Sequence, residues 1–540
     1  MGNAPTILPR RTMGEWTLQS HYPYKNAFGD VVVDGIFTTP TGKVVTIPGF
    51  YDGKHTWRIR FNPDEVGRWQ FRTSARPHDA ELIQEGEFEV QASEERGFLK
   101  ATPGQGWGFH YESGEPVFIF GDTVYELFGM AHCDTHVLPF LQRRASQGFN
   151  LLRVRLHTSA FQSVGDPPVP PEDFKSWHTR TTWPWGGTEQ SPRFDHFNLE
   201  YFHTVDQVVS QANALGIGLE MIMEAWGNEF PFNNRQVFVP EWEEFWMRYL
   251  IARYDAFPNV YIWTLMNEYE YYPNGDWHYK PVSDRWAIRM ARWVKGIAQH
   301  GHVIAIHNGP REPSFADRLQ LDPTAVDAIM FQEWGTRDAD LGWLAAGMEA
   351  QFERSLKGWG GSAVSSEWGY ERNPDLPPLA PHHDYCDVDH TRRGAWRSAF
   401  CALGIINGFE NSWGIFPLQD EDQAGVADLL HVRHFFTTMV PFHQMQPAPQ
   451  IVVNGNNAFG HEPRALATDD QSIVAVYLPT GGNVELTLAD KAYQAQWFDP
   501  RTGEMTDAAT ITTEKNGHAL FGAPAGGGER PWDWVLVLKR

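Results

Sequence analysis

Short apolar runs alternate with amphipathic segments through the middle of the chain, from about residue 99 to residue 440. Each run has the length and composition of a buried strand. The expected strands are residues 117–123, 149–157, 218–224, 260–268, 302–308, 328–334, 363–369 and 403–413. Alternation of strand and helix repeated eight times predicts a (β/α)8 barrel, and about 340 residues exceed the usual ~250, so some loops must be long.

Helical stripes separate several of these strands. Apolar residues fall on one helical face before the third expected strand, at Val205, Val208, Val209, Ala212 and Leu215. A second stripe, residues 286–297, precedes the fifth expected strand. Ser283 or Asp284 is the expected N-cap of this helix, because short polar side chains accept hydrogen bonds from the first turn.

Both flanks of this region have the period of strands instead. Trp57, Ile59 and Phe61 alternate with polar residues, and turn residues separate such segments before residue 99 and again after residue 440. We therefore predict an α/β chain with a central (β/α)8 TIM barrel (99–440) between an N-terminal β-sandwich (1–98) and a C-terminal β-sandwich (441–540).

Net charge and composition exclude several classes of binding partner. The net charge of −23 argues against a nucleic-acid or anionic-membrane surface, and no apolar run reaches the ~20 residues of a membrane span. The N-terminal residues lack the apolar core of a secretory signal, so we expect a cytoplasmic protein, or a periplasmic or secreted one if the start is trimmed. Three Cys form neither a disulfide framework nor a metal spacing, and we expect no metal and no cofactor. Oligomeric state stays open, a homo-oligomer included.

Aromatic residues are abundant, at 14% of the chain with 23 Trp. Large cores explain part of this number, and flat apolar walls of a concave site are the alternative. Trp183 and Trp185 fall in the longest expected loop. We expect them to form an aromatic platform there, with a small core of the loop itself as the other interpretation.

Polar residues end most of the expected barrel strands, and four of the eight ends offer a Glu. Barrel enzymes carry their chemistry at these ends. The residues are Asp122, Arg153 or Arg155, Glu224, Asn267 with Glu268, His307, Gln332 with Glu333, Glu367 and Trp413. Carboxyl groups facing one another across a sugar, with Trp walls, are the equipment of glycosidic-bond hydrolysis, in which one protonates the leaving oxygen and another attacks the anomeric carbon or activates water.

The segment Trp263-Thr-Leu-Met-Asn-Glu268 resembles the fourth strand of the large clan of retaining glycoside hydrolases with (β/α)8 barrels. The resemblance implies that Glu268 is the acid/base and that Asn267 holds the sugar 2-hydroxyl. Glu367, in Ser-Ser-Glu-Trp-Gly, matches the nucleophile. Arg153 matches the residue that keeps the nucleophile ionised, and Trp413 matches the floor of the sugar site.

The chain is more closely similar to apiosidase-like and cellulase-like bacterial barrels that follow a small β-sandwich. Gly-Asp-Thr at 121–123 carries this similarity, although that group often has Trp where this chain has Tyr125. The sixth strand departs from the wider clan. Glu333 and Trp334 stand where many members place a Tyr or His against the nucleophile, which leaves that supporting role unassigned.

The resemblance implies a retaining glycosidase that acts on oligosaccharides or polysaccharide fragments, and the long loops favour exo action. Alternatives remain open: Glu333 or Glu224 in place of Glu367, Arg155 in place of Arg153, or a non-catalytic carbohydrate-binding barrel. The expected substrate contacts are Asp122, Tyr125, Arg153, Asn267, Glu224, His307, Glu333, Trp334, Trp413 and His383.

Overall fold

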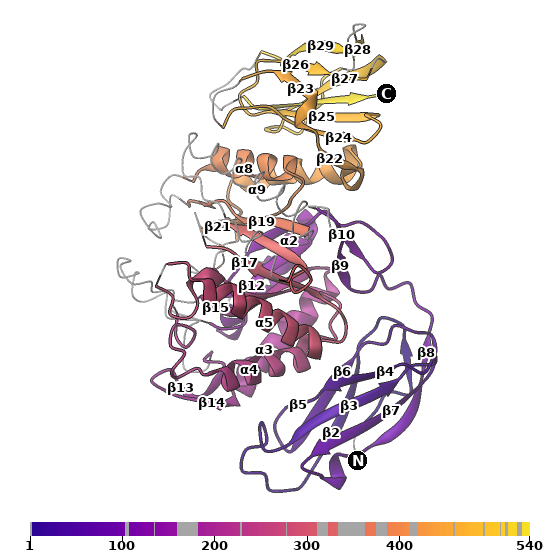
Figure 1. Cartoon of the computed structure of the whole chain (residues 1–540), viewed down its shortest axis with the longest axis vertical. Coiled ribbons are helices and arrows are strands. Elements are labelled where there is room, and N and C mark those ends of the chain that lie inside the picture. Colours follow the sequence, from indigo (N-terminus) through magenta and orange to yellow (C-terminus); the bar gives the residue numbers. More distant parts are fainter. Residues whose placement is uncertain are drawn as a thin grey trace.

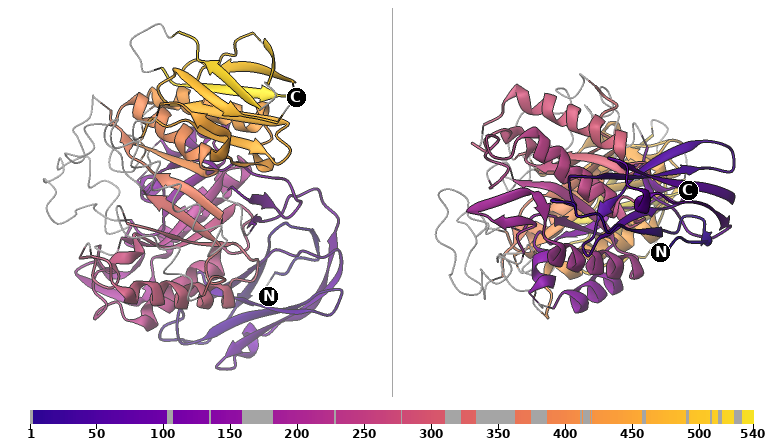
Figure 2. Two further views of the ribbon diagram at one scale, coloured as in Figure 1. Left: turned by 45° about the horizontal axis from the view of Figure 1, so that its top comes forward. Right: turned by 90° about the horizontal axis from the view of Figure 1, so that it is seen from below.

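The computed structural model describes residues 3–102, 107–133, 136–158, 182–226, 229–276, 278–309, 322–332, 362–373, 386–410, 412, 418, 420–456, 460–489, 492–507, 509–513, 517–525 and 532–540. Within these ranges, no helix is long and apolar enough to span a membrane. Three regions follow one another along the chain (Figure 1), and the N-terminal and C-terminal strands lie on different sides of the middle region (Figure 2).

Eight parallel strands close into a barrel, which confirms the predicted fold. In order they are β11 (Phe120–Thr123), β12 (Leu151–Arg155), β15 (Gly218–Trp226), β16 (Val260–Asn267), β17 (Val303–His307), β18 (Ala328–Gln332), β19 (Ser362–Glu367) and β21 (Gly404–Phe409). The pairing of β11 with β21 closes the ring, and the short β20 (Tyr370–Glu371) adds to the edge of β21. Every expected strand of the barrel is therefore present, although most end a residue or more earlier than predicted.

Helices cover the outside of the barrel. The described ones are α1 (Leu127–His132), α2 (Val137–Gln147), α3 (Leu199–Ala214), α4 (Pro240–Tyr254), α5 (Pro281–Ile297), α8 (Val388–Phe400) and α9 (Gly425–His434). A hairpin of β13 (Trp185–Thr188) and β14 (Ser191–Phe197), which the sequence analysis did not predict, precedes α3. A second hairpin, β9 (Leu99–Ala101) with β10 (Phe109–Tyr111), leads into the barrel.

The predicted N-cap of α5 is wrong. The helix begins at Pro281, with Lys280 as the N-cap, because proline presets the backbone of the first helical turn and lacks the N–H that would need a partner there. Asp284 instead accepts hydrogen bonds from the hydroxyls of Tyr269 and Tyr279, at 2.8 and 2.7 Å. It therefore ties the helix to the segment that follows β16.

Two sheets around one apolar core form the N-terminal region. The sheets are β1 (Ile7–Pro9), β8 (Glu85–Gln91), β7 (Gly67–Arg76), β3 (Val32–Thr38) and β4 (Val44–Pro48) in one, and β2 (Gly14–Gln19), β6 (Thr56–Phe61) and β5 (Phe50–Tyr51) in the other. Its contact with the barrel is an ion-pair network. Arg60 and Arg253 both bind Asp206, at 2.8 and 2.9 Å, and Arg253 also binds Asp52 at 2.9 Å.

The C-terminal region has the same two-sheet design. One sheet contains β22 (Met445–Pro447), β24 (Arg464–Thr468), β25 (Ile473–Leu478), β30 (Trp534–Lys539), β27 (Ala492–Phe498) and β28 (Ala509–Thr512), and the other β23 (Val452–Asn454), β26 (Asn483–Thr487) and β29 (His518–Gly522). Between this region and the barrel lie α8 and α9 (Figure 1). Both flanking sheet regions are therefore as the sequence predicted.

Candidate active site

The parallel register brings the predicted polar residues to one end of the barrel. Asn267 and Glu367 end strands β16 and β19, and Arg153 is the middle residue of β12. Their side chains meet although these three strands are not neighbours. Nη1 of Arg153 donates to Oε1 of Glu367 at 2.6 Å, and Nη2 donates to Oδ1 of Asn267. Arg153 has no exposed surface, so this contact is a buried one. The contact supports the predicted partnership of Arg153 with Glu367.

The phenol of Tyr125 also contacts Glu367. The hydroxyl of Tyr125 donates to the same Glu367 oxygen and lies 2.6 Å from Nη1 of Arg153. Because a guanidinium can only donate, the phenol accepts from Arg153 and directs its single hydrogen to Glu367. Burial, and secondarily the charge of Glu367, raises the pKa of Tyr125 well above its usual value, although Arg153 opposes the shift. Tyr125 is therefore a permanent donor, and it contacts the nucleophile candidate where a substrate contact was expected.

Glu268 has different surroundings. One oxygen accepts from Nε2 of Gln332 at 2.9 Å, and Oε2 has no partner among the described residues. Burial raises the pKa of Glu268 well above its usual range, and the negative charge of Glu367 adds to this. The backbone of Glu268 is left-handed, with φ of 54°, a conformation that non-glycine residues adopt mainly where function requires it. Glu268 is thus set up to hold a proton.

His307 contacts the backbone of Glu268 and the carboxyl group of Glu367. Its Nδ1 accepts from the backbone N–H of Glu268 at 3.3 Å, and its Nε2 lies 3.6 Å from Oε1 of Glu367. Burial, with a smaller contribution from Arg153, lowers the pKa of His307 well below its usual value, so the ring is neutral. Since Nδ1 accepts, the single ring hydrogen belongs on Nε2, facing Glu367.

Two residues of this site have no role in the sequence analysis. Gln332 was recognised only as a strand end, and Tyr370 was missed, although its hydroxyl lies 3.4 Å from that of Tyr125. Tyr370 follows Gly369, whose φ of 124° turns the chain after β19. The local sequence does not show that this turn directs the chain back to the site, so Tyr370 was not predicted as a site residue.

Asp122 and Glu224 form ion pairs with protein partners in place of the expected substrate contacts. Asp122 accepts from Arg144 at 2.7 Å and from Ser412 at 3.1 Å. Glu224 binds Arg235 at 2.5 Å, and burial raises its pKa to about 8 although Arg235 opposes the shift. Both side chains are completely buried. Both carboxylates therefore have structural roles, and the contact with Arg235 argues against Glu224 as an alternative nucleophile.

Arg155 also belongs to a different network from Arg153. It lies on the same strand as Arg153 but binds Glu229, at 2.9 Å, and Glu126 in place of Glu367.

The expectation of an aromatic platform was wrong. Trp183 and Trp185 are only 3% and 2% exposed, and Trp185 packs on Trp246 with ring centroids 4.6 Å apart. They are part of the main apolar core.

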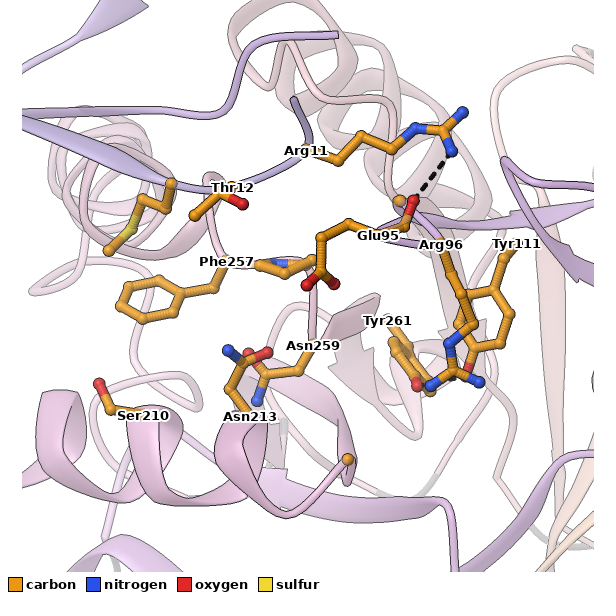
Figure 3. A pocket seen from close by; sticks show the side chains of 14 residues that line it. Arg11, Thr12, Glu95, Arg96, Tyr111, Ser210, Asn213, Phe257, Asn259 and Tyr261 are labelled. Atoms are coloured by element: carbon orange, nitrogen blue, oxygen red, sulfur yellow. Dashed lines mark hydrogen bonds between the residues drawn. The ribbon is translucent and has the colours of Figure 1, made fainter. Parts of the chain in front are cut away.

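Four expected substrate contacts, namely Glu333, Trp334, His383 and Trp413, lie outside the described residues. Within the described part of the chain, no group of His, Cys, Asp and Glu could hold a metal ion. A hollow of about 430 Å³ lies at the opposite, amino-terminal end of the barrel (Figure 3). Its lining includes Asn213 and Asn259 of the barrel region, Arg11 of the N-terminal region, and Glu95 from the segment between β8 and β9. It is remote from the carboxyl ends of the strands.

The fold and this buried pair of carboxyl groups are those of a (β/α)8 glycoside hydrolase. A family model described as the apiosidase-like catalytic domain matches residues 105–429, and the chain belongs to that family. A domain of unknown function matches residues 12–76, and a domain described as collagen-binding in a collagenase matches residues 447–539. The resemblance inferred from the sequence is therefore confirmed.

Solved structures share the fold at low identity. A protein from Bacteroides vulgatus ATCC 8482 described as a glycoside hydrolase is 16% identical with a TM-score of 0.71, covering 99% of each chain. A glycoside hydrolase family 5 protein from the same organism is 15% identical with a TM-score of 0.59, covering 82% of this chain and 94% of its own. At such identities the likeness establishes the fold alone. No curated protein matches the chain.

Proposed function

We propose that the chain is a retaining glycoside hydrolase in which Glu367 is the nucleophile and Glu268 is the acid/base. The observation that carries this proposal is the contrast between the two carboxyl groups. Glu367 accepts hydrogen bonds from Arg153 and Tyr125, which favour its charged form. Burial and the neighbouring charge favour the protonated form of Glu268. Paired carboxyl groups whose environments differ in this way divide into a charged and an acidic partner.

The reaction then proceeds in two displacements. An oxygen of Glu367 attacks the anomeric carbon, the bond to the leaving oxygen breaks, and the proton of Glu268 goes to that oxygen. Once Glu367 is esterified, its negative charge is gone and the pKa of Glu268 falls, since that charge was one of the causes of the raised value. Glu268 can then take a proton from water, which attacks the anomeric carbon and returns the electron pair of the ester bond to Glu367.

The first experiment is aglycone release from a panel of aryl pyranosides and furanosides, with apiosides included because of the family. Wild type, Glu367→Gln, and Glu224→Gln and Glu333→Gln as rival variants are measured side by side. We expect one glycoside to be turned over, with activity abolished by Glu367→Gln. Full activity of that variant would transfer the nucleophile role to Glu333. Turnover of no glycoside, with sugar binding retained, would favour a carbohydrate-binding barrel.

The stereochemistry of the product tests the retaining mechanism separately. Proton NMR of the first product formed should show the anomeric configuration of the substrate, because two displacements restore it. The opposite anomer would indicate a single displacement by water. We also propose exo action, from the long loops around this barrel end. Release of single sugar units from the start of digestion supports it, and a ladder of intermediate oligosaccharides contradicts it.

A further inference from the structure

Helix α8 separates the barrel from the C-terminal sheets (Figure 1) and contacts β24 and β25. Its Trp396 stacks on Tyr477 of β25, with ring centroids 6.0 Å apart and the ring planes 18° from parallel. The same helix carries Arg392 and Arg397, and neither has exposed surface. This interface therefore encloses positive charge together with its aromatic rings.

Arg392 is completely matched by acidic groups. It donates to Oδ1 of Asp533 at 2.9 Å and to Asp428 at 3.1 Å. The second oxygen of Asp533 accepts from the hydroxyl of Tyr477 at 3.1 Å as well as from Arg392 at 3.2 Å. The acidic groups on this side of α8 are thus already engaged by partners other than Arg397.

Arg397 has no such match. None of its three guanidinium nitrogens finds a hydrogen-bond acceptor among the described residues. Its charged neighbours Arg464 and Arg393 are positive and offer no acceptor, and Arg464 has its own partner in Glu462 at 3.7 Å. Burial first, and these two arginines next, lower the pKa of Arg397 to about 10, although Tyr477 opposes the shift. The side chain therefore remains charged at neutral pH, and loss of its proton does not relieve the imbalance.

The contact between the N-terminal region and the barrel shows how this chain otherwise buries arginine. Arg60 and Arg253 share Asp206, and Arg253 has Asp52 as a second partner. Arg60 also binds Glu15 at 2.9 Å, so two guanidinium groups there meet three carboxylates. A buried charge without a counter-charge is costly, and buried polar groups without partners mark places where a water or an ion belongs. Arg397 therefore needs a negatively charged partner that the described residues do not supply.

We propose that Arg397 binds a small inorganic anion such as chloride between α8 and the C-terminal sheet. The interface has no exposed surface at Arg397, so a monatomic anion fits better than a substrate or an organic acid. Its negative charge offsets the Arg397 guanidinium and links the barrel to the C-terminal region. This site is independent of the proposed glycosidase chemistry.

Thermal unfolding of the full chain tests the proposal. Sodium chloride is replaced stepwise by sodium gluconate at constant ionic strength, so that only the identity of the anion changes. An anion that binds the folded state alone raises stability with the logarithm of its concentration. We expect Tm to rise by roughly 1–2 °C for each tenfold increase of chloride above its dissociation constant.

Two variants make the test specific. Arg397→Met keeps the apolar volume and removes the charge, so its Tm should not respond to chloride. Arg292→Met removes a surface arginine that is paired with Asp322, and it should respond as wild type does. In gluconate we expect Arg397→Met to unfold at a higher temperature than wild type, and saturating chloride to reverse this order.

The outcome that overturns the proposal is a wild type without response to chloride, with Arg397→Met more stable in both salts. That result would mean that the chain tolerates an uncompensated buried charge. If Arg397→Met does not fold, crystals of wild type grown in bromide decide the matter. An anomalous peak beside the Arg397 guanidinium supports the site, and its absence at full bromide occupancy elsewhere contradicts it.

Discussion

One buried Glu lies at the carboxyl end of each of the strands β16 and β19. The hydrogen-bond donors around the two carboxyl groups differ in number and in charge. At β19, Glu367 accepts from the guanidinium of Arg153 and from the hydroxyl of Tyr125. At β16, Glu268 has one neutral donor, Gln332, and an oxygen without a partner among the described residues. Two side chains of identical chemistry thus become a base and an acid through their neighbours, and this difference is the basis of the following predictions.

Removal of the charge at β19 should have the largest effect. Glu367→Gln keeps the shape and the hydrogen bonds but cannot form the ester bond, so kcat should fall by about 10⁴-fold or more for every substrate. Initial rates with the best aryl glycoside measure this fall. The matched control is Glu224→Gln, an equally buried strand-end Glu that is bound to Arg235. A larger loss in Glu224→Gln would exchange the roles assigned here.

Removal of the acid at β16 should have an effect that depends on the leaving group. Glu268→Gln should lower kcat/KM by about 10²–10⁴-fold for substrates whose leaving oxygen needs a proton. Activated aryl glycosides, whose leaving groups depart as anions, should be affected far less in this first step. A plot of log(kcat/KM) against leaving-group pKa provides the measurement. Equal losses across the series would contradict the acid role.

Tyr125→Phe should sharpen the comparison by removing one donor from Glu367. The donor stabilises the carboxylate that leaves when the intermediate breaks down, so this second step should slow by roughly 10–100-fold, the value of one hydrogen bond to a charged group. With activated substrates, kcat and KM should then fall together while kcat/KM changes little. A merely structural role would not produce this pattern.

The control for Tyr125→Phe comes from the other end of the barrel. Tyr261→Phe removes an equally buried phenol, which is hydrogen-bonded to the hydroxyl of Tyr111 at 2.5 Å near the hollow in Figure 3. It should leave kcat and KM unchanged. If Tyr261→Phe lowers kcat as much as Tyr125→Phe does, general destabilisation explains both variants.

The smallest effect concerns stability. In the unfolded chain Glu268 ionises near its ordinary value of 4.5, whereas burial and Glu367 keep it protonated in the fold to much higher pH. Stability is therefore lost as pH rises above 4.5, because the unfolded state releases the proton first. Glu268→Gln should raise Tm by about 2 °C or more at pH 7 and by much less at pH 4. The surface variant Glu89→Gln should follow wild type at both values.

Several features of this protein could be predicted from the sequence because they depend on local periodicity. Strand-length apolar runs and helical stripes repeat through the barrel, and each strand end is visible as the place where a run meets a polar residue. Glu268 and Glu367 could be placed among the polar strand ends for this reason, and the resemblance to the glycoside hydrolase clan singled them out. Parallel strands must place such ends on one rim. The pairing of Arg153 with Glu367 was expected from the resemblance to the glycoside hydrolase clan, and the pattern alone left Arg155 open beside Arg153.

The tertiary structure decided which of several equivalent polar residues meet. Arg153 and Arg155 are two positions apart on one strand, yet one binds Glu367 and the other binds Glu229, because strand twist and the loop after β15 set the partners. Trp183 was expected in an aromatic platform and is core, since it packs on Trp185 and Phe230. Arg397 looked like any helix arginine, and its lack of a counter-charge appears only when α8 is packed against the C-terminal sheet. Periodicity is a local property of the sequence, whereas the partner of a side chain depends on how elements distant in sequence pack together.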